Sequence, residues 1–442
     1  MRPTGRPALP AAATVLALCG VAGLLGACSS PAPTVAGTPT VTTPASVTSS
    51  SVPTASATSA SSPPTSSASA SSSSPASSTT GTPSPPPTSP PTSCSARIVS
   101  SLSASEQAGQ LLMVGLDVNA SRTSLDSLVT GQHLGGVILL GGWFNGAAAV
   151  RSTTAHLAGL ASDSATGGLG LMLAADQEGG AVQQLRGAGF TRMPSARSQN
   201  SLSDSSLTAQ ATTWARQIKA AGVNVNLAPV ADTVPASLGT GNGPIGQYGR
   251  EFSSDPDDNA GKVSAFIAGM SAGGVASTVK HFPGIGRIRN NTDFYSTGIT
   301  DTTTTTTDPY LRPFASGIRA GADMVMVGSA IYSRIDPGVN APFSRAIVTD
   351  LLRGRLGYGG VVITDDVGAA KAVSGTPTGE RATRFVDAGG DIVLSATPSS
   401  IPTMHAALTA RMASDPAFAQ KVEVAVTRVV KLKLKMGLAR CG

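Results

Sequence analysis

The feature that most constrains the fold is an alternation, after Ser101, of eight short apolar runs with longer Ala-rich amphipathic stretches. The runs are rich in Val, Ile and Leu and lack polar alternation, which is typical of parallel strands covered on both faces. Eight repeated β–α units in one domain favour an α/β fold of the closed (β/α)8 TIM-barrel type over a doubly wound open sheet. The expected strands span residues 111–118, 136–140, 170–175, 223–230, 274–279, 323–327, 360–364 and 391–395.

A segment of very different composition precedes these runs. Residues 29–93 contain no charged side chain and consist almost entirely of Ser, Thr, Pro and Ala. Such a segment has too little apolar surface to offset the entropy that it would lose on ordering. We therefore expect a disordered tether over residues 28–93. A single barrel domain is expected over residues 94–442, because no similar linker divides the remainder.

The N-terminal residues have the order of an export signal. Arg2 and Arg6 precede an apolar run that ends in the segment LGAC, residues 25–28. This segment resembles a bacterial lipobox, so we expect a signal peptide over residues 1–27 and acylation of Cys28. A lipid at Cys28 would anchor the exported protein to the outer face of the cytoplasmic membrane, in the cell envelope. A transmembrane helix is the alternative, because the run is about long enough to span a bilayer.

The positions of the cysteines and the charge of the chain argue for a disulfide and against metal or nucleic-acid binding. Cys94 and Cys441 flank the expected domain, whose ends a closed barrel would bring together. An exported protein meets oxidising conditions, so we expect a Cys94–Cys441 disulfide, with two unpaired thiols as the alternative. The chain lacks a Cys/His cluster, which argues against a zinc site. The net charge of +6 comes without a Lys/Arg run, which argues against nucleic-acid binding.

Ionisable residues follow the expected strands repeatedly. Asp176 follows the third strand, Asp232 the fourth, Lys280–His281 the fifth and Asp365–Asp366 the seventh. Because TIM barrels carry their catalytic residues at the C-terminal ends of the strands, these side chains should meet at one barrel mouth. Such a gathering is hard to explain as solvated surface alone.

The most specific segment is KHFPGIG, residues 280–286. Together with four other segments it resembles glycoside hydrolase family 3, and in particular the short single-domain bacterial β-N-acetylglucosaminidases. The other segments are DQEGG at 176–180, APV at 228–230, REF at 250–252 and TDD at 364–366. The resemblance implies a retaining, exo-acting enzyme that removes terminal N-acetylglucosamine from cell-wall-derived glycans and acts as a monomer. Two carboxyl groups suffice for such cleavage, so we expect neither a metal nor an organic cofactor.

The same resemblance implies roles for individual residues. Asp365 matches the family's nucleophile, Asp176 a carboxylate that binds sugar hydroxyls, and Arg250, Lys280 and His281 the sugar-binding residues. Charged donors and a carboxylate suit the recognition of a polyhydroxyl ligand. The alternatives are a helix N-cap at Asp365, a buried ion pair at Lys280 and a satisfied core histidine at His281.

Other residues near these motifs are interpreted as mainly structural. Asp366 is a better N-cap candidate than Asp365, and Glu178 with the glycines after it is expected to be structural. Trp143 and Phe144 could stack on a sugar ring, although loop packing is the preferred interpretation.

The loop after the fifth strand departs from the family pattern. Related acetylglucosaminidases carry Asp-Ser-His there, with the His as general acid/base, whereas this chain has NTD at 291–293. Asp293 can take the role of acid/base if its pKa is raised, although Arg287 and Arg289 would lower that pKa if they came close. A shifted loop with another acid, or a protein that only binds sugar, are the alternatives.

A second departure lies near Asp176. The family often has Arg where this chain has Gln184, and Arg186 is offset by two residues. The offset changes the direction of the Arg side chain, so this departure bears on the substrate. A neighbouring hypothesis for the enzyme is the specificity of a β-glucosidase or a phosphorylase on the same fold. A glycan-binding surface lipoprotein without turnover is the hypothesis from a different class.

Overall fold

The computed structural model describes residues 93–441. The expected signal peptide, nearly all of the expected tether and the lipidation residue Cys28 lie outside the described residues. Within residues 93–441, no helix is both long and apolar enough to cross a membrane.

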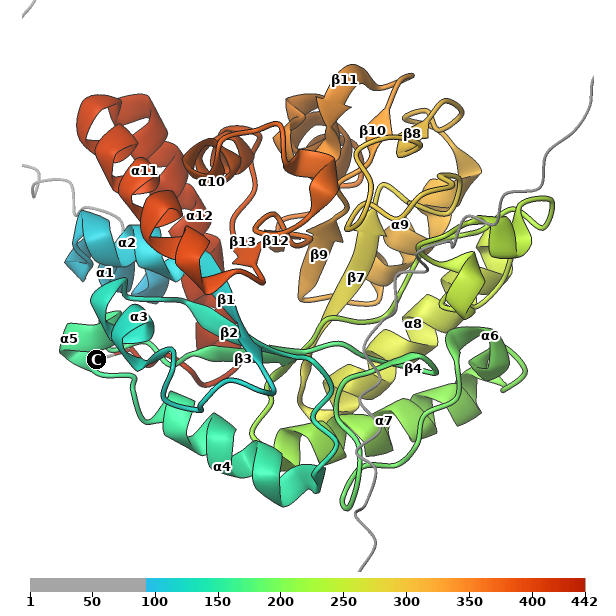
Figure 1. Cartoon of the computed structure of the whole chain (residues 1–442), viewed down its shortest axis with the longest axis horizontal. Coiled ribbons are helices and arrows are strands. Elements are labelled where there is room, and N and C mark those ends of the chain that lie inside the picture. The colour runs from blue at the N-terminus through green and yellow to red at the C-terminus, as the bar shows by residue number, and fades with distance from the viewer. Residues whose placement is uncertain (1–92, 442) are drawn as a thin grey trace, which may run out of the picture. The chain divides into compact units, whose positions relative to one another are not determined.

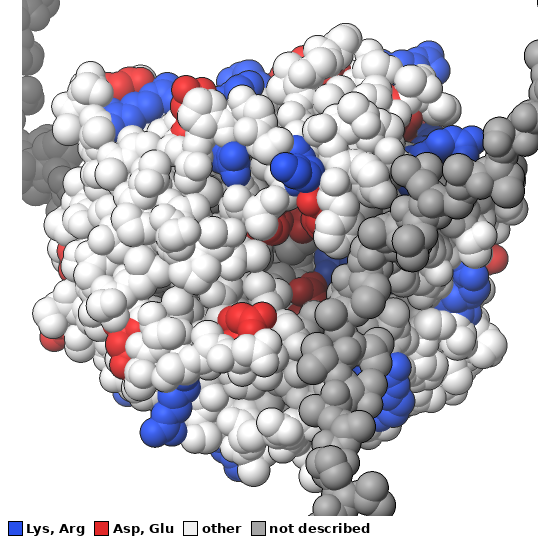
Figure 2. Space-filling view, in the orientation of Figure 1, with Lys and Arg blue, Asp and Glu red and all other residues white. Residues whose placement is uncertain are grey.

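Eight parallel strands form one barrel-like sheet, in agreement with the predicted fold (Figure 1). Their order around the sheet follows their order in the sequence, and a bridge between Ile363 and Ile392 brings the two edges together. The face seen in Figure 2 is hollowed at its centre, and acidic side chains lie inside the hollow. The strands are β1 (Leu112–Asp117), β2 (Gly136–Leu140), β3 (Met172–Ala175), β6 (Val225–Asn226), β7 (Ala276–Phe282), β9 (Met324–Val327), β12 (Val361–Thr364) and β13 (Val393–Ser395).

Five further strands of the described residues lie outside the barrel and were not predicted. The first two form a hairpin directly after β3, and the other three form a small sheet near the ends of β7 and β9. They are β4 (Gln177–Gly179), β5 (Val182–Gln183), β8 (Thr300–Asp301), β10 (Ile331–Tyr332) and β11 (Asp336–Asn340). Loops at this end of the barrel are therefore held by hydrogen-bonded pairs.

Helices surround the barrel, and local signals fix their ends. The Asp255 side chain accepts hydrogen bonds from the N–H groups at the start of α8, and Gly274, in the left-handed conformation, caps the C-terminal end of that helix. A π-helix over Ala346–Arg355 lies between β9 and β12. The α-helices are α1 (Cys94–Ser101), α2 (Ala104–Gln110), α3 (Asp126–Gly131), α4 (Gly146–Ala158), α5 (Asp163–Thr166), α6 (Ala196–Gln199), α7 (Asp204–Ala220), α8 (Pro256–Gly273), α9 (Arg312–Arg319), α10 (Thr378–Asp387), α11 (Ile401–Ser414) and α12 (Pro416–Lys435).

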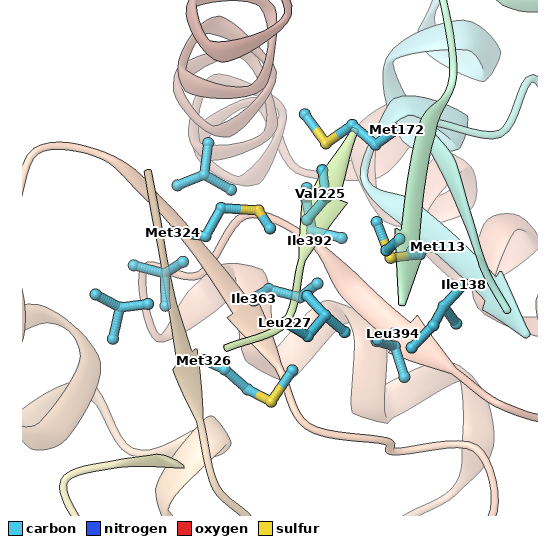
Figure 3. Close-up of a cluster of buried hydrophobic side chains, with 14 of the residues drawn as sticks. Met113, Ile138, Met172, Val225, Leu227, Met324, Met326, Ile363, Ile392 and Leu394 are labelled. Carbon is cyan, nitrogen blue, oxygen red and sulfur yellow. The ribbon is translucent and has the colours of Figure 1, made fainter. Parts of the chain in front are cut away.

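Apolar side chains from the strands form a buried cluster (Figure 3). Met113 from β1, Met172 from β3 and Met324 with Met326 from β9 lie among Ile, Leu and Val side chains. Methionine adapts to irregular gaps, which suits a packed strand cluster. Because this cluster is apolar, the polar side chains of the barrel lie at the ends of the strands.

The two ends of the described chain are joined covalently. Cys94, the first residue of α1, forms a disulfide with Cys441, and their Cα atoms are 5.7 Å apart. The Leu438 carbonyl accepts a hydrogen bond from the Gly170 N–H, just before β3 begins. The disulfide end of the chain therefore packs where the strands start, not where they end.

Candidate active site

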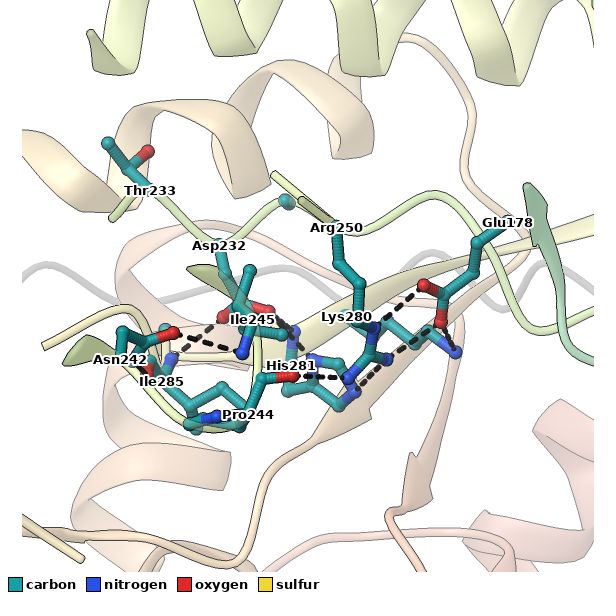
Figure 4. A network of polar contacts seen from close by, with 12 residues as sticks. Glu178, Asp232, Thr233, Asn242, Pro244, Ile245, Arg250, Lys280, His281 and Ile285 are labelled. Atoms are coloured by element: carbon teal, nitrogen blue, oxygen red, sulfur yellow. Dashed lines mark hydrogen bonds and ion pairs between the residues drawn. The ribbon is translucent and has the colours of Figure 1, made fainter. Parts of the chain in front are cut away.

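The residues expected to form the site lie on segments at the C-terminal ends of the barrel strands. Asp176 follows β3, Lys280 and His281 lie in the last residues of β7, and Asp365 directly follows β12. Strand β7 runs three residues beyond the predicted end at residue 279, because the polar residues after it stay buried. Arg250 comes from the loop between β6 and α8 and reaches the same network (Figure 4).

A buried ion-pair network connects three of these side chains, Asp176, Arg250 and Lys280, through the carboxylate of Glu178. The Lys280 Nζ lies 2.5 Å from Asp176 Oδ1 and 2.6 Å from Glu178 Oε1. Arg250 donates two hydrogen bonds to the Glu178 carboxylate, at 2.7 and 2.8 Å. The fork-to-carboxylate pairing fixes the guanidinium plane. The Lys280 side chain is 2% exposed, so without these carboxylates its charge would be uncompensated.

The electrostatics of this network favour the charged forms of Glu178, Lys280 and Arg250. Burial opposes the charge on Glu178, but Arg250 and Lys280 outweigh it and lower the pKa of the carboxyl to about 2. Burial also opposes the charge on Lys280, yet Asp176 and Glu178 raise the pKa of its ammonium. Glu178, expected to be structural, therefore lies between two predicted sugar-binding cations. The sequence signal that could have predicted this role is the position of Glu178, two residues after Asp176 in the same motif.

His281 is held by Asp232, a residue to which no role was assigned from the sequence. The ring Nδ1 lies 2.7 Å from Asp232 Oδ2, and the same carboxylate accepts the backbone N–H groups of His281 and Ile285. An Arg250 nitrogen faces the ring Nε2 at 3.5 Å. A tautomer with the proton on Nδ1 satisfies both contacts, because Nε2 then accepts and Nδ1 donates.

Asp365 and Asp366 differ in their surroundings. The Asp366 carboxylate accepts backbone N–H groups from Gly368, Ala369 and Ala396, so it caps a turn and links that turn to the loop after β13. No α-helix begins directly here, so the expected helix-capping role becomes a turn-capping one. The Asp365 carboxylate accepts the Asp366 N–H at 2.9 Å and is partly exposed. It is thus the carboxylate of the pair that is placed to meet a ligand.

Asp293 lies in the loop after β7, close enough to Asp365 for their charges to interact. Desolvation and the negative charge of Asp365 raise the pKa of the Asp293 carboxyl to about 6. Because Asp293 is exposed to solvent, desolvation can be only partial, and the repulsion by the Asp365 carboxylate gains weight as a cause of the raised pKa. Arg250 acts in the opposite direction. The Arg287 guanidinium, which was expected to lower this pKa if it came close, pairs with Asp308 instead.

Backbone contacts fix the loop that carries Asp293. The carbonyls of Thr292 and Asp293 accept N–H groups of Ala372 and Lys371, at 3.0 and 3.1 Å. The Asn291 side chain accepts the Asp293 N–H at 2.8 Å. Asn291 therefore shapes the backbone of the turn.

The aromatic residues after β2 divide into one packed and one exposed side chain. Trp143 is 8% exposed and donates its ring N–H to the Leu140 carbonyl, which agrees with loop packing. Phe144 is 51% exposed, and the Arg186 guanidinium lies 4.5 Å from its ring centroid. Gln184 stands where the family often has Arg, and its side-chain oxygen accepts a hydrogen bond from the Gly142 N–H at 2.9 Å.

A carboxyl group with a raised pKa at Asp293, next to the carboxylate of Asp365 and beside charged hydrogen-bonding groups, suits acid–base chemistry on a polyhydroxyl ligand. Within residues 93–441, no group of three or more His, Cys, Asp or Glu side chains is arranged to hold a metal ion.

Known proteins resemble this chain over the whole barrel. Residues 103–432 match the model of the glycosyl hydrolase family 3 N terminal domain. A beta-hexosaminidase from Stenotrophomonas maltophilia is 35% identical over 252 residues, which are 53% of this chain and 70% of that protein.

Solved structures agree with the sequence match. A beta-N-acetylhexosaminidase from Beutenbergia cavernae is 46% identical with a TM-score of 0.73, and the match covers 75% of this chain and 98% of that one. A glycoside hydrolase family 3 beta-N-acetylglucosaminidase from Paenibacillus is 27% identical with a TM-score of 0.67, over 77% of this chain and 64% of that one. The protein is therefore a glycoside hydrolase that belongs to glycosyl hydrolase family 3.

Proposed function

We propose that the protein is a retaining exo-β-N-acetylglucosaminidase. The observation that carries the proposal is the pair Asp365 and Asp293, in which the Asp293 carboxyl has a pKa raised to about 6. A carboxylic acid that holds its proton near neutral pH can protonate a leaving group, while a neighbouring carboxylate attacks. The names of the relatives, beta-hexosaminidase and beta-N-acetylhexosaminidase, support N-acetylglucosamine as the sugar.

In the proposed first step, Asp365 attacks the anomeric carbon and Asp293 gives its proton to the glycosidic oxygen. The bond from carbon to the leaving oxygen breaks, and a glycosyl–Asp365 ester remains. In the second step, Asp293 takes a proton from water, which displaces Asp365 and releases the sugar. Asp176, Arg250, Lys280 and His281 bind and orient the hydroxyl groups throughout, because their own network holds them in place.

The setting proposed for this activity is the cell envelope. If residues 1–27 act as an export signal and Cys28 carries a lipid, the domain would lie outside the cytoplasmic membrane on a tether of about 65 residues. Terminal N-acetylglucosamine of cell-wall-derived glycans is the substrate class that fits this location.

The test follows nitrophenol release from 4-nitrophenyl N-acetyl-β-glucosaminide and from the β-glucoside, with and without phosphate. We expect turnover of the first substrate by the wild type and its loss in Asp365→Asn. Asp293→Asn should lose less on this activated substrate, because a nitrophenolate leaves without much protonation. Dependence on phosphate with release of a sugar phosphate would indicate a phosphorylase. Silence on both substrates, with sugar binding retained, would favour the glycan-binding lipoprotein.

A further inference from the structure

Four aromatic side chains are exposed on loops that follow barrel strands. They are four of the five large hydrophobic side chains exposed in the part of the chain that the structure describes: Phe144 after β2, Tyr248 after β6, and Phe294 with Tyr295 after β7. The fifth, Val424, lies on α12. Because the loops after the strands surround the mouth of a TIM barrel, these aromatic residues lie on the side of the barrel that carries the candidate active site.

Phe294 and Tyr295 are exposed together and directly follow Asp293. Their exposed fractions are 60% and 50%. Among the described residues neither ring forms a ring–ring or a cation–π pair, whereas the Phe144 ring contacts Arg186. Two consecutive aromatic rings in water keep apolar area unburied, and such a patch beside an active site is typical of a binding surface.

The backbone that carries the two rings is held in place. The Asn290 N–H donates to the Gly298 carbonyl at 3.1 Å and closes the loop at its base. The N–H groups of Phe294 and Tyr295 both donate to the Asn291 carbonyl, at 3.2 and 3.0 Å. A surface that is ordered before a ligand arrives loses little entropy when the ligand binds.

The proposed role of Asp293 defines which part of a substrate meets this loop. A general acid must reach the glycosidic oxygen, which joins the sugar that is removed to the unit that leaves. The sugar that is removed lies over Asp365 and the ion-pair network. The leaving unit therefore lies beside the loop of Asp293, and the next two residues of that loop are Phe294 and Tyr295.

We propose that Phe294 and Tyr295 form the leaving-group subsite, where the sugar beyond the scissile bond stacks. The C–H groups of a pyranose ring give it apolar faces that match a flat aromatic side chain. Two rings are too small a surface for a protein partner, whose interface usually takes about 20–30 residues on each side. The inference rests on the proposed hydrolytic function and extends it, because it assigns the preference for a saccharide leaving group to these residues.

The test compares kcat/KM of the full-length protein on N,N′-diacetylchitobiose and on methyl N-acetyl-β-glucosaminide. Both leaving groups are alcohols that need a proton, so the ratio of the two values isolates recognition of the second sugar. We expect Phe294→Ala to lower this ratio about threefold to tenfold, the usual size of one aromatic stacking contact. The loss should appear in the KM for chitobiose more than in kcat, because stacking is equal in the ground state and the transition state.

Conservative variants separate stacking from apolar bulk. Phe294→Trp keeps a flat face and should retain the ratio, whereas Phe294→Leu should lower it as Phe294→Ala does. Val424→Ala, at an exposed apolar position of α12, is the matched control and should leave the ratio unchanged. Tyr295→Ala should also lower the ratio and serves as the test if Phe294→Ala does not fold.

A ratio that Phe294→Ala and Tyr295→Ala leave unchanged, while the wild type is active, would overturn this inference alone. An equal fall on both glycosides would also overturn it, since that result indicates a displaced Asp293. A wild-type chain without turnover of either glycoside would instead contradict the hydrolytic function, and the leaving-group subsite with it.

Discussion

At the scale of single residues, the chemistry depends on how Asp293 differs from Asp365. The family pattern places a histidine in the loop after the fifth barrel strand, and this chain places a carboxyl group there. A histidine titrates near neutral pH without assistance, whereas an aspartic acid needs a raised pKa to hold its proton. Desolvation and the Asp365 charge supply that rise, to about 6. Under the proposed mechanism, Asp293 would therefore hold the proton that a histidine holds in the family pattern.

The raised pKa of Asp293 predicts how the activity falls on the alkaline side of the pH–activity profile. Because Asp293 must be protonated to act as acid, kcat/KM should fall as the pH rises through about 6. Asp293→Asn should remove this limb and lower kcat on N,N′-diacetylchitobiose by about 10²–10⁴-fold, the usual contribution of a general acid. Steady-state kinetics between pH 4 and 9 measure both. An alkaline limb that survives in Asp293→Asn would assign the acid to another group.

Glu178 predicts a coupled loss of binding and stability. Glu178→Gln leaves Lys280 and Arg250 with one carboxylate fewer, so we expect KM to rise and the free energy of unfolding at pH 7 to fall by about 3–5 kcal/mol. The folded-state pKa of about 2 lies below the roughly 4.3 of an unfolded glutamate. The stabilisation is thus complete above about pH 4.3 and is lost as the pH falls through 2.

Denaturant unfolding between pH 2.5 and 7 checks this prediction. The wild type should lose more stability than Glu178→Gln as the medium becomes acid, since the variant no longer has the titrating group. Glu423→Gln, an exposed position on α12, is the control and should match the wild type throughout. Equal acid sensitivity of Glu178→Gln and the wild type would contradict the role given to this ion pair.

The sequence predicted which polar residues gather, but not which of them touch. Asp176, Lys280 and Asp365 were expected at one mouth because each follows a strand. The bonds from Asp232 to His281 and from Glu178 to Arg250 join residues 49 and 72 positions apart. Such pairings depend on the backbone path of loops, on which local sequence patterns carry little information.

At the scale of elements, the positions of the buried strands were easier to predict than the lengths of those strands. All eight barrel strands formed within or overlapping the expected runs, because continuous apolar segments have to be covered on both faces. Strand β6, however, is only Val225–Asn226 within the expected run of 223–230. Its continuation is an isolated bridge between Val230 and Lys280, because the intervening Pro229 cannot donate a ladder hydrogen bond. The hairpin after β3 and the π-helix leave no comparable sequence signal.

Helix α12 contains a lysine that predicts a pH-dependent stability. Lys433 is fully buried, its Nζ donates to Gln110 at 2.6 Å, and burial lowers the pKa of the amine to about 7. The folded state disfavours the charged amine, so the cost is full below pH 7 and vanishes as the pH rises to about 10.4, the value of unfolded lysine.

Replacing Lys433 by Met should therefore stabilise the protein by about 1–4 kcal/mol at pH 6, and by much less at pH 10. Thermal unfolding at the two pH values measures the difference. Lys431→Met, an exposed neighbour on the same helix, should change the Tm little at either pH. A stability gain that does not depend on pH would show that Lys433 stays charged in its buried site.

At the scale of the whole molecule, the candidate active site and the disulfide that joins the chain ends lie at opposite ends of the barrel. The carboxyl groups lie on segments where strands end, while the Cys94–Cys441 bond lies where strands begin, next to the contact between Gly170 and Leu438. The bond spans 347 residues and links the first helix, α1, to the segment that follows the last helix, α12. Changes at this bond should thus act on unfolding and leave the site geometry intact.

The double variant Cys94→Ser/Cys441→Ser tests this separation without leaving one thiol of the pair unpaired. In the chain-entropy account, a long closed loop restricts the unfolded ensemble, and loss of a native disulfide usually costs about 2–5 kcal/mol. We expect a fall of that size in the unfolding free energy, with kcat/KM on the aryl glycoside within about twofold of the wild type at 25 °C. Dithiothreitol should lower the Tm of the wild type toward that of the double variant and leave the variant unchanged. A folded double variant without activity would show instead that the closure of the chain shapes the barrel mouth, because no side chain of the pair reaches it.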